Sequence, residues 1–291
     1  MARIVRTDRE LEVPRVDAAL RAARDFRPQG YLPLALGANT IGWIRRDHAG
    51  RLRAWPGVFE FSEINICLRP TAEAVLSAAL AEVAQALARE GTIRGWRDET
   101  YAIRADDGAA VLFHLERAAM RFFGLTSSAA HLNGYAGEGE KLRILITRRA
   151  ASKAIDPGLL DTLVAGGVPS GQDAWQTLLR ECGEEAGIPV ALAERARPAG
   201  VLRVCREVPD GLHREILFIH DLALPPGFTP CNTDGEVSEF LSLDPATLLE
   251  RIAHGEMTVE AGLVGADFAL RHGMIEDEDG KIGAALEACR R

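Results

Sequence analysis

Hydrophobic positions in the first half of the chain follow both helical and strand periods. Residues 13–26 and 71–90 carry apolar side chains three and four positions apart, which predicts two helices. Residues 57–68 alternate apolar and polar side chains, which predicts a strand. Residues 99–125 have the pattern of a strand, an Asp-Asp-Gly turn, a second strand and a short helix. We therefore expect a mixed α/β domain up to about residue 125.

The second half of the chain begins a new pattern. Residues 126–141 are small and polar, and the apolar run at 142–149 predicts a buried strand. Strand and helix patterns then alternate. The strand candidates are 162–171, which enters a glycine-rich loop, 199–208, 215–224 and 235–244, and the helix candidates are 173–186, 246–255 and 259–273. Because hairpins as well as helices join these strands, we expect a mixed sheet with helices on both faces.

These patterns predict two domains, which also suits a length of 291 residues. The fold class is α+β or α/β. We expect a smaller mixed α/β domain over residues 1–125, a larger domain over 126–275 and a C-terminal tail over 276–291.

Composition and charge exclude several classes of function. The formal charge is −8 and no basic block occurs, which argues against a nucleic-acid partner. The five cysteines form no CxxC pair, a pattern typical of reduced thiols. The first twenty residues carry charges throughout, so we expect no secretory signal, and no apolar run reaches transmembrane length. We expect a cytoplasmic protein without a membrane partner.

The stretch RECGEEAGI, residues 180–188, concentrates carboxylates on one helical turn. Glu181, Glu184 and Glu185 stand at i, i+3 and i+4, where like charges repel, and they lie near the helix C-terminus, where the macrodipole disfavours negative charge. A divalent cation such as Mg²⁺ would offset this repulsion. The alternative is a solvated acidic face, which is common for such a motif alone. The preceding glycine-rich loop favours the metal site.

The spacing of these residues resembles a known motif. The pattern is similar to the Nudix box, G-x5-E-x7-R-E-U-x-E-E-x-G-U, where U is a bulky apolar residue. In this chain it consists of Gly166, thirteen further residues and then Arg180-Glu181-Cys182-x-Glu184-Glu185-x-Gly187-Ile188. Cys182 stands in place of the usual Ile, Leu or Val. Gln172 stands in place of the first glutamate, so it retains a hydrogen-bonding group without the charge.

The resemblance implies a Nudix hydrolase with an α/β/α sandwich around a mixed sheet. Members of this family cleave a diphosphate linked to another moiety, with Mg²⁺ or Mn²⁺ as cofactor. Glu181, Glu184 and Glu185 then take the role of metal ligands. Arg180 is expected to orient one of these glutamates.

The resemblance also implies that a downstream acid completes the site as a metal ligand or as the base. Glu236 is the first candidate for this catalytic and metal-binding role, with Glu239 second and Asp234 third. The alternative is that Glu236 is an ordinary loop acid.

Residues 26–275 resemble a two-domain Nudix subgroup with an N-terminal DUF4743-like domain, related to the segment fused to thiamine pyrophosphokinase in some fungi. The subgroup implies hydrolysis of thiamine diphosphate derivatives, especially oxidised or damaged forms, to the monophosphates. The alternatives are another diphosphate, such as ADP-ribose or NADH, or a Nudix protein that binds a metabolite without cleaving it. The family also implies a possible homodimer.

Five residues outside the carboxylate helix are candidates for substrate binding. Lys153 and Arg149 offer cations to phosphate oxygens. The backbone at Gly166 and Gly167 allows a close approach of the ligand. Trp96 is the candidate for stacking on the heterocycle of the substrate from the first domain, across the domain cleft, with Arg97 and Glu99 as the next choices there. The alternatives are solvent-exposed charge for Arg149 and core packing for Trp96.

Overall fold

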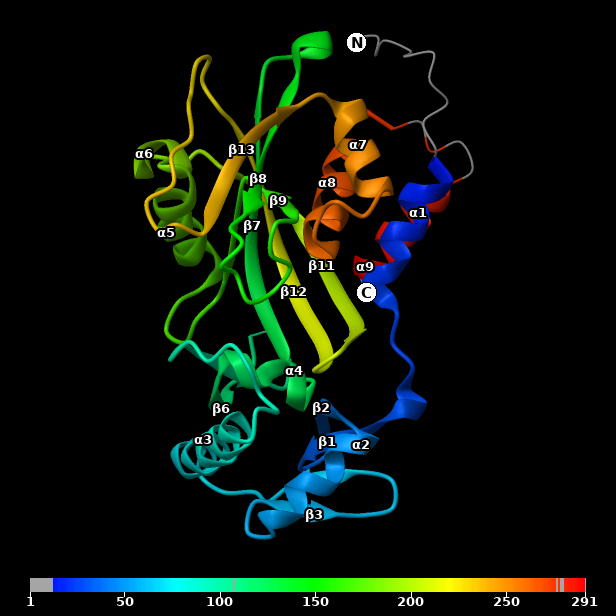
Figure 1. Ribbon diagram of the computed structural model, residues 1–291, viewed down its shortest axis with the longest axis vertical. Helices are drawn as coiled ribbons and strands as arrows, with labels where there is room; N and C mark the ends of the chain where they lie inside the picture. The colour runs from blue at the N-terminus through cyan, green and yellow to red at the C-terminus, as the bar shows by residue number, and fades with distance from the viewer. Residues whose placement is uncertain (1–12, 107, 276, 278–279, 291) are drawn as a thin grey trace.

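The computed structural model describes residues 13–290 except 107, 276, 278 and 279 (Figure 1). Most of the stretch from which we predict the absence of a secretory signal lies outside these residues. The elements of the first hundred residues lie mostly at one end of the long axis, and the large sheet lies at the other.

The N-terminal half contains a four-stranded sheet with the order β2-β1-β4-β3. Strands β1 and β4 are parallel, and the other neighbours are antiparallel. The strands are β1 (Tyr31–Leu36), β2 (Asn39–Arg45), β3 (Phe59–Phe61) and β4 (Ile66–Leu68), with helix α2 (Arg46–Ala49) and 3₁₀ turns at Ala22–Arg24, Pro28–Gly30 and Gly50–Ala54.

The strand predicted over residues 57–68 is instead a hairpin of two short strands. The chain reverses at 62–65, where the amide of Ser62 donates to the carbonyl of Asn65 at 3.0 Å. Ile64, which the alternating pattern counted as an inward position, is 76% exposed. Alternation alone therefore did not show the turn that Ser62 and Asn65 close.

The rest of this half follows the prediction. Helix α3 (Glu73–Arg89) buries its apolar stripe, and β5 (Thr100–Arg104) pairs with β6 (Val111–Glu116) as an antiparallel hairpin. A 3₁₀ turn at Arg117–Ala119 and helix α4 (Met120–Phe123) end the domain. The buried side chains of these elements form one apolar core.

The second half contains a seven-stranded sheet with the order β11-β12-β7-β8-β13; β10 also pairs with β7, and β9 with β8. Only β7 and β12 are parallel among these pairs. The strands are β7 (Thr126–Ala136), β8 (Arg143–Arg149), β9 (Leu160–Thr162), β10 (Val164–Gly167), β11 (Arg197–Val208), β12 (Gly211–Ala223) and β13 (Val237–Leu243), with a 3₁₀ turn at Gly139–Lys141.

Helices cover both faces of this sheet. Alternate residues of β8 separate the two cores: Ile144 and Ile146 belong to one, and Leu145 to the other. Helix α5 packs on the Leu145 face, while α1, α7, α8 and α9 contribute to the opposite core. The helices are α1 (Val13–Arg21), α5 (Ala174–Ala186), α6 (Val190–Ala193), α7 (Pro245–Ala253), α8 (Val259–Arg271) and α9 (Lys281–Arg290). The predicted α/β/α sandwich with a mixed sheet is confirmed.

Strand β7 was not predicted, although it lies at the centre of the sheet. Its sequence, TSSAAHLNGYA, has few of the large β-branched residues that mark a strand. The small side chains allow close packing: a Cβ added at Gly134 would lie 2.1 Å from the Leu163 side chain. This need for close packing, rather than strand propensity, explains the composition of β7.

Both ends of the described chain pack on the second half. Val16 and Leu20 of α1 and Leu286 of α9, which lies in the predicted tail, join the core of the large sheet. The domain boundaries at 125 and 275 stay predictions, and the core of the large sheet includes residues beyond both. No helix among residues 13–290, apart from the gaps named above, has the length and apolar character to cross a bilayer.

Gly187 terminates α5, and its replacement tests whether the end of the helix requires a glycine. Gly187 has φ +61°, and an added Cβ would lie 2.3 Å from Cys231 Sγ. We expect Gly187→Ala to lower the free energy of unfolding by about 1–3 kcal/mol because the left-handed backbone and the contact both resist a side chain.

The control for this substitution lies on the same helix. Gly183 has open space around its added Cβ, so Gly183→Ala should raise the free energy of unfolding by about 0.5–1 kcal/mol. Urea denaturation of both variants measures the difference. Equal effects at the two positions would contradict this account of the α5 C-terminus.

Candidate active site

Helix α5 is fixed at both ends by local hydrogen bonds. Asp173 caps the N-terminus, since its carboxylate accepts the Gln176 amide at 2.8 Å and the Gln176 side chain accepts the Asp173 amide at 3.1 Å. Gln172 accepts a hydrogen bond from the Thr177 hydroxyl at 3.2 Å, so this position keeps a hydrogen bond without a charge. At the C-terminus, the Ile188 amide donates to Cys182 at 2.8 Å.

Arg180 lies between two of the predicted metal ligands. It donates to Glu184 at 2.6 Å and to Glu181 at 2.8 Å. A planar guanidinium with several donors suits this arrangement because it fixes both carboxylates at once. The structure therefore places Arg180 where an orienting residue is expected.

Glu181 packs directly over the first glycine of the motif. A Cβ added at Gly166 would lie 2.3 Å from Glu181 Oε1, so no other residue fits there without movement. The Glu181 side chain is 12% exposed. Burial raises the pKa of Glu181 to about 7, although the Arg180 guanidinium acts in the opposite direction.

Glu185 is the most enclosed carboxylate of the motif. One of its oxygens accepts the Ala165 amide of β10 at 2.9 Å. Burial and the neighbouring Glu181 charge raise the pKa of Glu185, while the Ala165 amide lowers it. This hydrogen bond joins helix α5 to the strand beside it and directs the Glu185 carboxylate toward the loop before β13.

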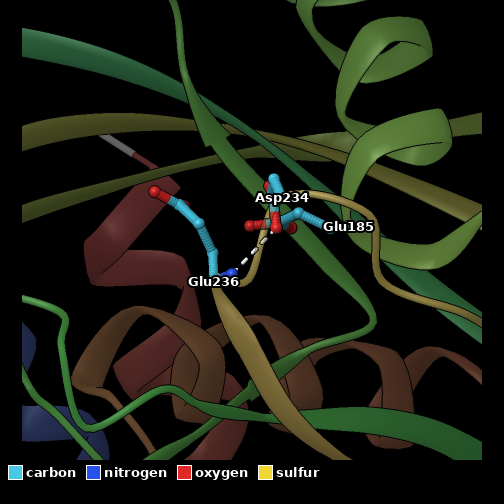
Figure 2. Close-up of side chains that lie close together, drawn as sticks. All are labelled: Glu185, Asp234 and Glu236. Carbon is cyan, nitrogen blue, oxygen red and sulfur yellow. Dashed lines mark hydrogen bonds between the residues drawn. The ribbon is translucent and has the colours of Figure 1, made fainter.

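Three carboxylates lie close enough together to hold a metal ion. Among the described residues, this group consists of Glu185, Asp234 and Glu236, each with an oxygen within 4.8 Å of those of the other two. Figure 2 shows Glu185 reaching from α5 toward the loop that carries the other two. The Asp234 carboxylate accepts the Glu236 amide at 2.8 Å. Asn232 in turn accepts the Asp234 and Gly235 amides at 3.0 and 2.9 Å, which shapes this loop.

The group differs in part from the predicted ligand set. It contains Glu185 and Glu236 and adds Asp234, which the sequence placed third. Glu181 and Glu184 instead pair with Arg180, and Glu239 pairs with Arg148 at 2.8 Å. The metal-binding role of each of these acids stays a prediction.

Two cations from different halves of the chain approach Glu236. Lys153 donates to its carboxylate, and Arg97 of the N-terminal half donates to the other oxygen at 3.4 Å. Burial raises the pKa of Glu236, but the Lys153 hydrogen bond and charge and the Arg97 charge outweigh it, so the pKa is lowered. Glu236 is therefore ionised at neutral pH.

A cavity of about 420 Å³ lies beside these acids, and both halves of the chain line it. The predicted substrate-binding residues Lys153, Arg149, Gly166 and Gly167 are among its walls. Arg149 also donates to Asp161 at 2.8 Å and to the Ile155 carbonyl, so much of its hydrogen-bonding capacity is used to hold the cavity wall together.

A second space of about 10 Å³, the size of one water, lies between Glu185 and Glu236.

Trp96 is not among the residues that line the large cavity. Its ring packs on the N-terminal core, and its indole NH donates to Asp98 at 2.8 Å. Its neighbours Gly95 and Arg97 line the cavity instead. The stacking role of Trp96 stays a prediction, and this geometry favours the packing alternative.

Four arginines and a tyrosine of the N-terminal half reach the cavity. They are Arg94, Arg97, Tyr101, Arg117 and Arg121. The sequence offered Arg97 as a candidate after Trp96. It did not indicate Tyr101 or the other three arginines, because the arginines lie in the segments that flank a hairpin and have the pattern of ordinary surface charge. Only the apposition of the two halves brings them to the site.

A buried ion cluster forms another part of the cavity wall. His213 contacts Glu260 at 3.1 Å and Glu215 at 3.5 Å. Ser127 donates to Glu215 at 3.0 Å, and Arg206 donates to Glu260 at 3.3 Å. Burial lowers the pKa of His213, but its hydrogen bonds to the two glutamates outweigh this effect and raise the pKa to about 9. The same contacts lower the pKa of both glutamates.

Comparison with known proteins identifies the class of this chain. The family model of the NUDIX domain matches residues 128–259, and that of the Domain of unknown function DUF4743 matches residues 15–127. Nudix hydrolase 24, chloroplastic, of Arabidopsis thaliana is 34% identical over 255 residues, 85% of this chain and 69% of the relative. Nudix hydrolase 20, chloroplastic, of the same plant is 35% identical over 263 residues, 85% and 70% of the two chains.

Among solved structures, the crystal structure of DR0079 from Deinococcus radiodurans has a TM-score of 0.43 and 24% identity, and the match covers 55% of this chain and 92% of that one.

The matches to families and plant relatives define a hydrolase that acts on pyrophosphate bonds. The chain belongs to the Nudix hydrolase family and carries an N-terminal DUF4743 domain.

The His213 cluster predicts a specific dependence of stability on pH. Because the pKa of His213 is raised from 6.5 to about 9, its stabilising effect is complete below pH 6.5 and is lost as the pH rises through about 9. We expect the unfolding free-energy difference between wild type and His213→Gln to shrink by roughly 3 kcal/mol between about pH 6 and pH 10.

Urea denaturation at several pH values measures this difference. The exposed His254, replaced by glutamine in the same way, is the control for the loss of one imidazole. A His213→Gln difference that stayed constant over the range would show that His213 is uncharged in the folded protein.

Proposed function

We propose that this Nudix hydrolase cleaves the diphosphate of thiamine diphosphate derivatives, in particular oxidised or damaged forms, to a monophosphate and phosphate, with Mg²⁺ or Mn²⁺ as cofactor. The observation that supports the reaction is the group Glu185, Asp234 and Glu236 beside a cavity lined with cations. The thiamine part of the proposal rests on the resemblance of the whole chain to the two-domain subgroup.

The donor set suits a hard divalent cation. Three carboxylates offer oxygen ligands within 4.8 Å of one another, and Mg²⁺ prefers such oxygens. Glu185, Asp234 and Glu236 would hold the ion, with Glu181 and Glu184 as further ligands from the same helix. When bound, the cation neutralises negative charge on the diphosphate oxygens during displacement.

The chain itself supplies the remaining functions. Lys153 places an ammonium next to Glu236 and binds a phosphate oxygen. Gly166 and Gly167 line the cavity where the diphosphate would bind, and their lack of side chains makes room for Glu181 and Tyr101 beside β10. Glu236, which Lys153 and Arg97 keep ionised, is either a ligand of the ion together with the other acids or the base that accepts a proton from the attacking water.

A second candidate substrate is a nucleoside diphosphate derivative such as ADP-ribose or NADH. The same acids and cations would act on its diphosphate, and a cavity of about 420 Å³ holds part of either kind of molecule. Assays of phosphate or monophosphate release from thiamine diphosphate, its oxo and oxy derivatives, ADP-ribose and NADH, with and without Mg²⁺, discriminate between them. NADH hydrolysis far above that of every thiamine compound would reject the first proposal.

Two further properties belong to this proposal. The cytoplasmic location and the homodimer stay predictions, and the plant relatives carry the word chloroplastic in their names.

Replacement of Glu185 tests the metal site. We expect Glu185→Gln to lower the rate of hydrolysis by at least two to three orders of magnitude, because it removes a charge that would face the cation and the developing negative charge. Steady-state assays at saturating Mg²⁺ measure the rate, and Mn²⁺ titration followed by electron paramagnetic resonance measures ion binding.

The matched control is Glu82→Gln, which makes the same change on the exposed face of α3. Near-normal turnover and Mn²⁺ affinity in the Glu185→Gln protein would remove Glu185 from the metal site.

A further inference from the structure

The hairpin β5–β6 of the N-terminal half packs against strand β10 and the loop that follows it. The Ser170 amide donates to the Thr100 carbonyl at 2.8 Å, and the Ser170 hydroxyl lies 2.8 Å from His114 Nδ1. A Cβ added at Gly167 would lie 1.8 Å from the Tyr101 hydroxyl, so the ring contacts the backbone there. These contacts fix the end of the hairpin beside the diphosphate cavity.

A single buried carboxylate organises the arginines at this end. Glu116 is 4% exposed, and its oxygens accept the amides of Arg97 at 3.0 Å, Glu99 at 3.1 Å and Ala118 at 3.2 Å. The segment before β5 and the turn after β6 are therefore held to the same side chain. A buried carboxylate satisfied by three backbone donors is a rigid anchor.

The segment before β5 is itself tightly built. Asp98 has a positive φ of 58°, uncommon for a residue other than glycine, and its side chain accepts the Trp96 indole NH at 2.8 Å. The Arg117 amide donates to the Glu99 carbonyl at 2.8 Å. This geometry presents two arginine side chains to the cavity from adjacent positions.

Both arginines keep hydrogen-bonding capacity beyond their partners in the protein. Arg117 donates to Glu99 at 2.9 Å, and Arg97 to Glu236 at 3.4 Å, through one nitrogen each. The Arg117 guanidinium carbon would lie 3.7 Å from a Cβ at Gly167. A guanidinium carries five N–H donors, so each arginine has donors left for an oxyanion next to β10.

We propose that the N-terminal domain supplies the phosphate-binding half of the active site, in which Arg117 and Arg97 bind oxygens of the diphosphate and Glu116 positions both arginines. The inference rests on the proposed function for the reaction, but it concerns only how the anion is held. Arg97 exchanges the Glu236 carboxylate for a phosphate oxygen when the anion enters. Arg117 holds its place through Glu99 and contacts the anion beside Gly167.

Anion binding without turnover tests this inference on the full chain. The probe is methylenediphosphonate, a diphosphate analogue that resists hydrolysis, titrated by calorimetry in buffer with EDTA. We expect Arg117→Ala and Arg97→Ala each to weaken the affinity about 10- to 100-fold, as loss of a charge-assisted contact predicts. Arg117→Lys should recover part of the affinity because it keeps the charge but lacks the planar fork.

The control is Arg89→Ala, which removes an exposed arginine at the end of α3, away from the cavity. Its affinity for the probe should equal that of wild type. Wild-type affinity in both cavity variants, with loss only in Lys153→Ala, would overturn the inference.

The positioning role of Glu116 has its own readout. Glu116→Gln should weaken probe binding by a smaller factor, but it should cause no further loss in the Arg117→Ala/Arg97→Ala background. Thermal denaturation shows whether each variant is folded at the temperature of the titration. An equal loss from Glu116→Gln with and without the two arginines would assign Glu116 a general structural role and contradict positioning.

The substrate assay separates this inference from the proposed function. If wild type cleaves no thiamine diphosphate derivative but the arginine variants lose the probe, the proposed substrate is wrong and the arginine site stands. If thiamine derivatives are cleaved and both arginine variants keep the wild-type KM and kcat, the proposed function stands and the arginine site is wrong.

Discussion

The contact between helix α5 and strand β10 is the constraint on which the active site depends. Glu181 lies directly over Gly166, and Glu185 accepts the Ala165 amide, so two acids of one helical turn are fixed against one strand. The helix cannot slide along β10 without breaking the Glu185–Ala165 hydrogen bond and moving its apolar face out of the core. The motif glycine and the motif glutamates are therefore one packing unit, and a change in either displaces the other.

The electrostatics of the site follow from this packing. Burial of these carboxylates, and after it the charge of a neighbouring glutamate, raises the pKa of Glu181 and Glu185. Glu236 is the exception, since Lys153 and Arg97 hold it ionised although it is partly buried. Carboxylates close enough to share one cation, with Lys153 and Arg97 beside them, suit a diphosphate bound through a cation. The carboxylates offset the charge of the cation, and the basic side chains offset the charge of the diphosphate.

The two halves of the chain are joined at the same place where the chemistry is expected. Tyr101 contacts the backbone at Gly167, and Ser170 bonds to both Thr100 and His114. The helix α1 at the start of the described chain also packs in the core of the large sheet. The N-terminal half is therefore attached to the Nudix half at the active site and also at the helices on the other face of the large sheet. A movement of the N-terminal half would alter the cavity.

The sequence by itself determined the elements that obey local rules. Capping residues and apolar stripes predicted α3, α5, α7 and α8 closely, and the spacing from Gly166 to Ile188 identified the family and the carboxylate helix. The short-range rules failed at β7, where small residues replace strand formers because close packing decides the composition. They also failed at 57–68, where a turn interrupts an alternating pattern.

Only the tertiary structure decided which distant groups meet. Asp234 joined Glu185 and Glu236 because the loop before β13 folds back on α5, and Trp96 turned into the N-terminal core while Arg97 and Arg117 reached the cavity. Such contacts link residues up to 139 positions apart, as between Arg97 and Glu236. No local pattern specifies them, because their energies arise from burial and from charges that other elements bring together.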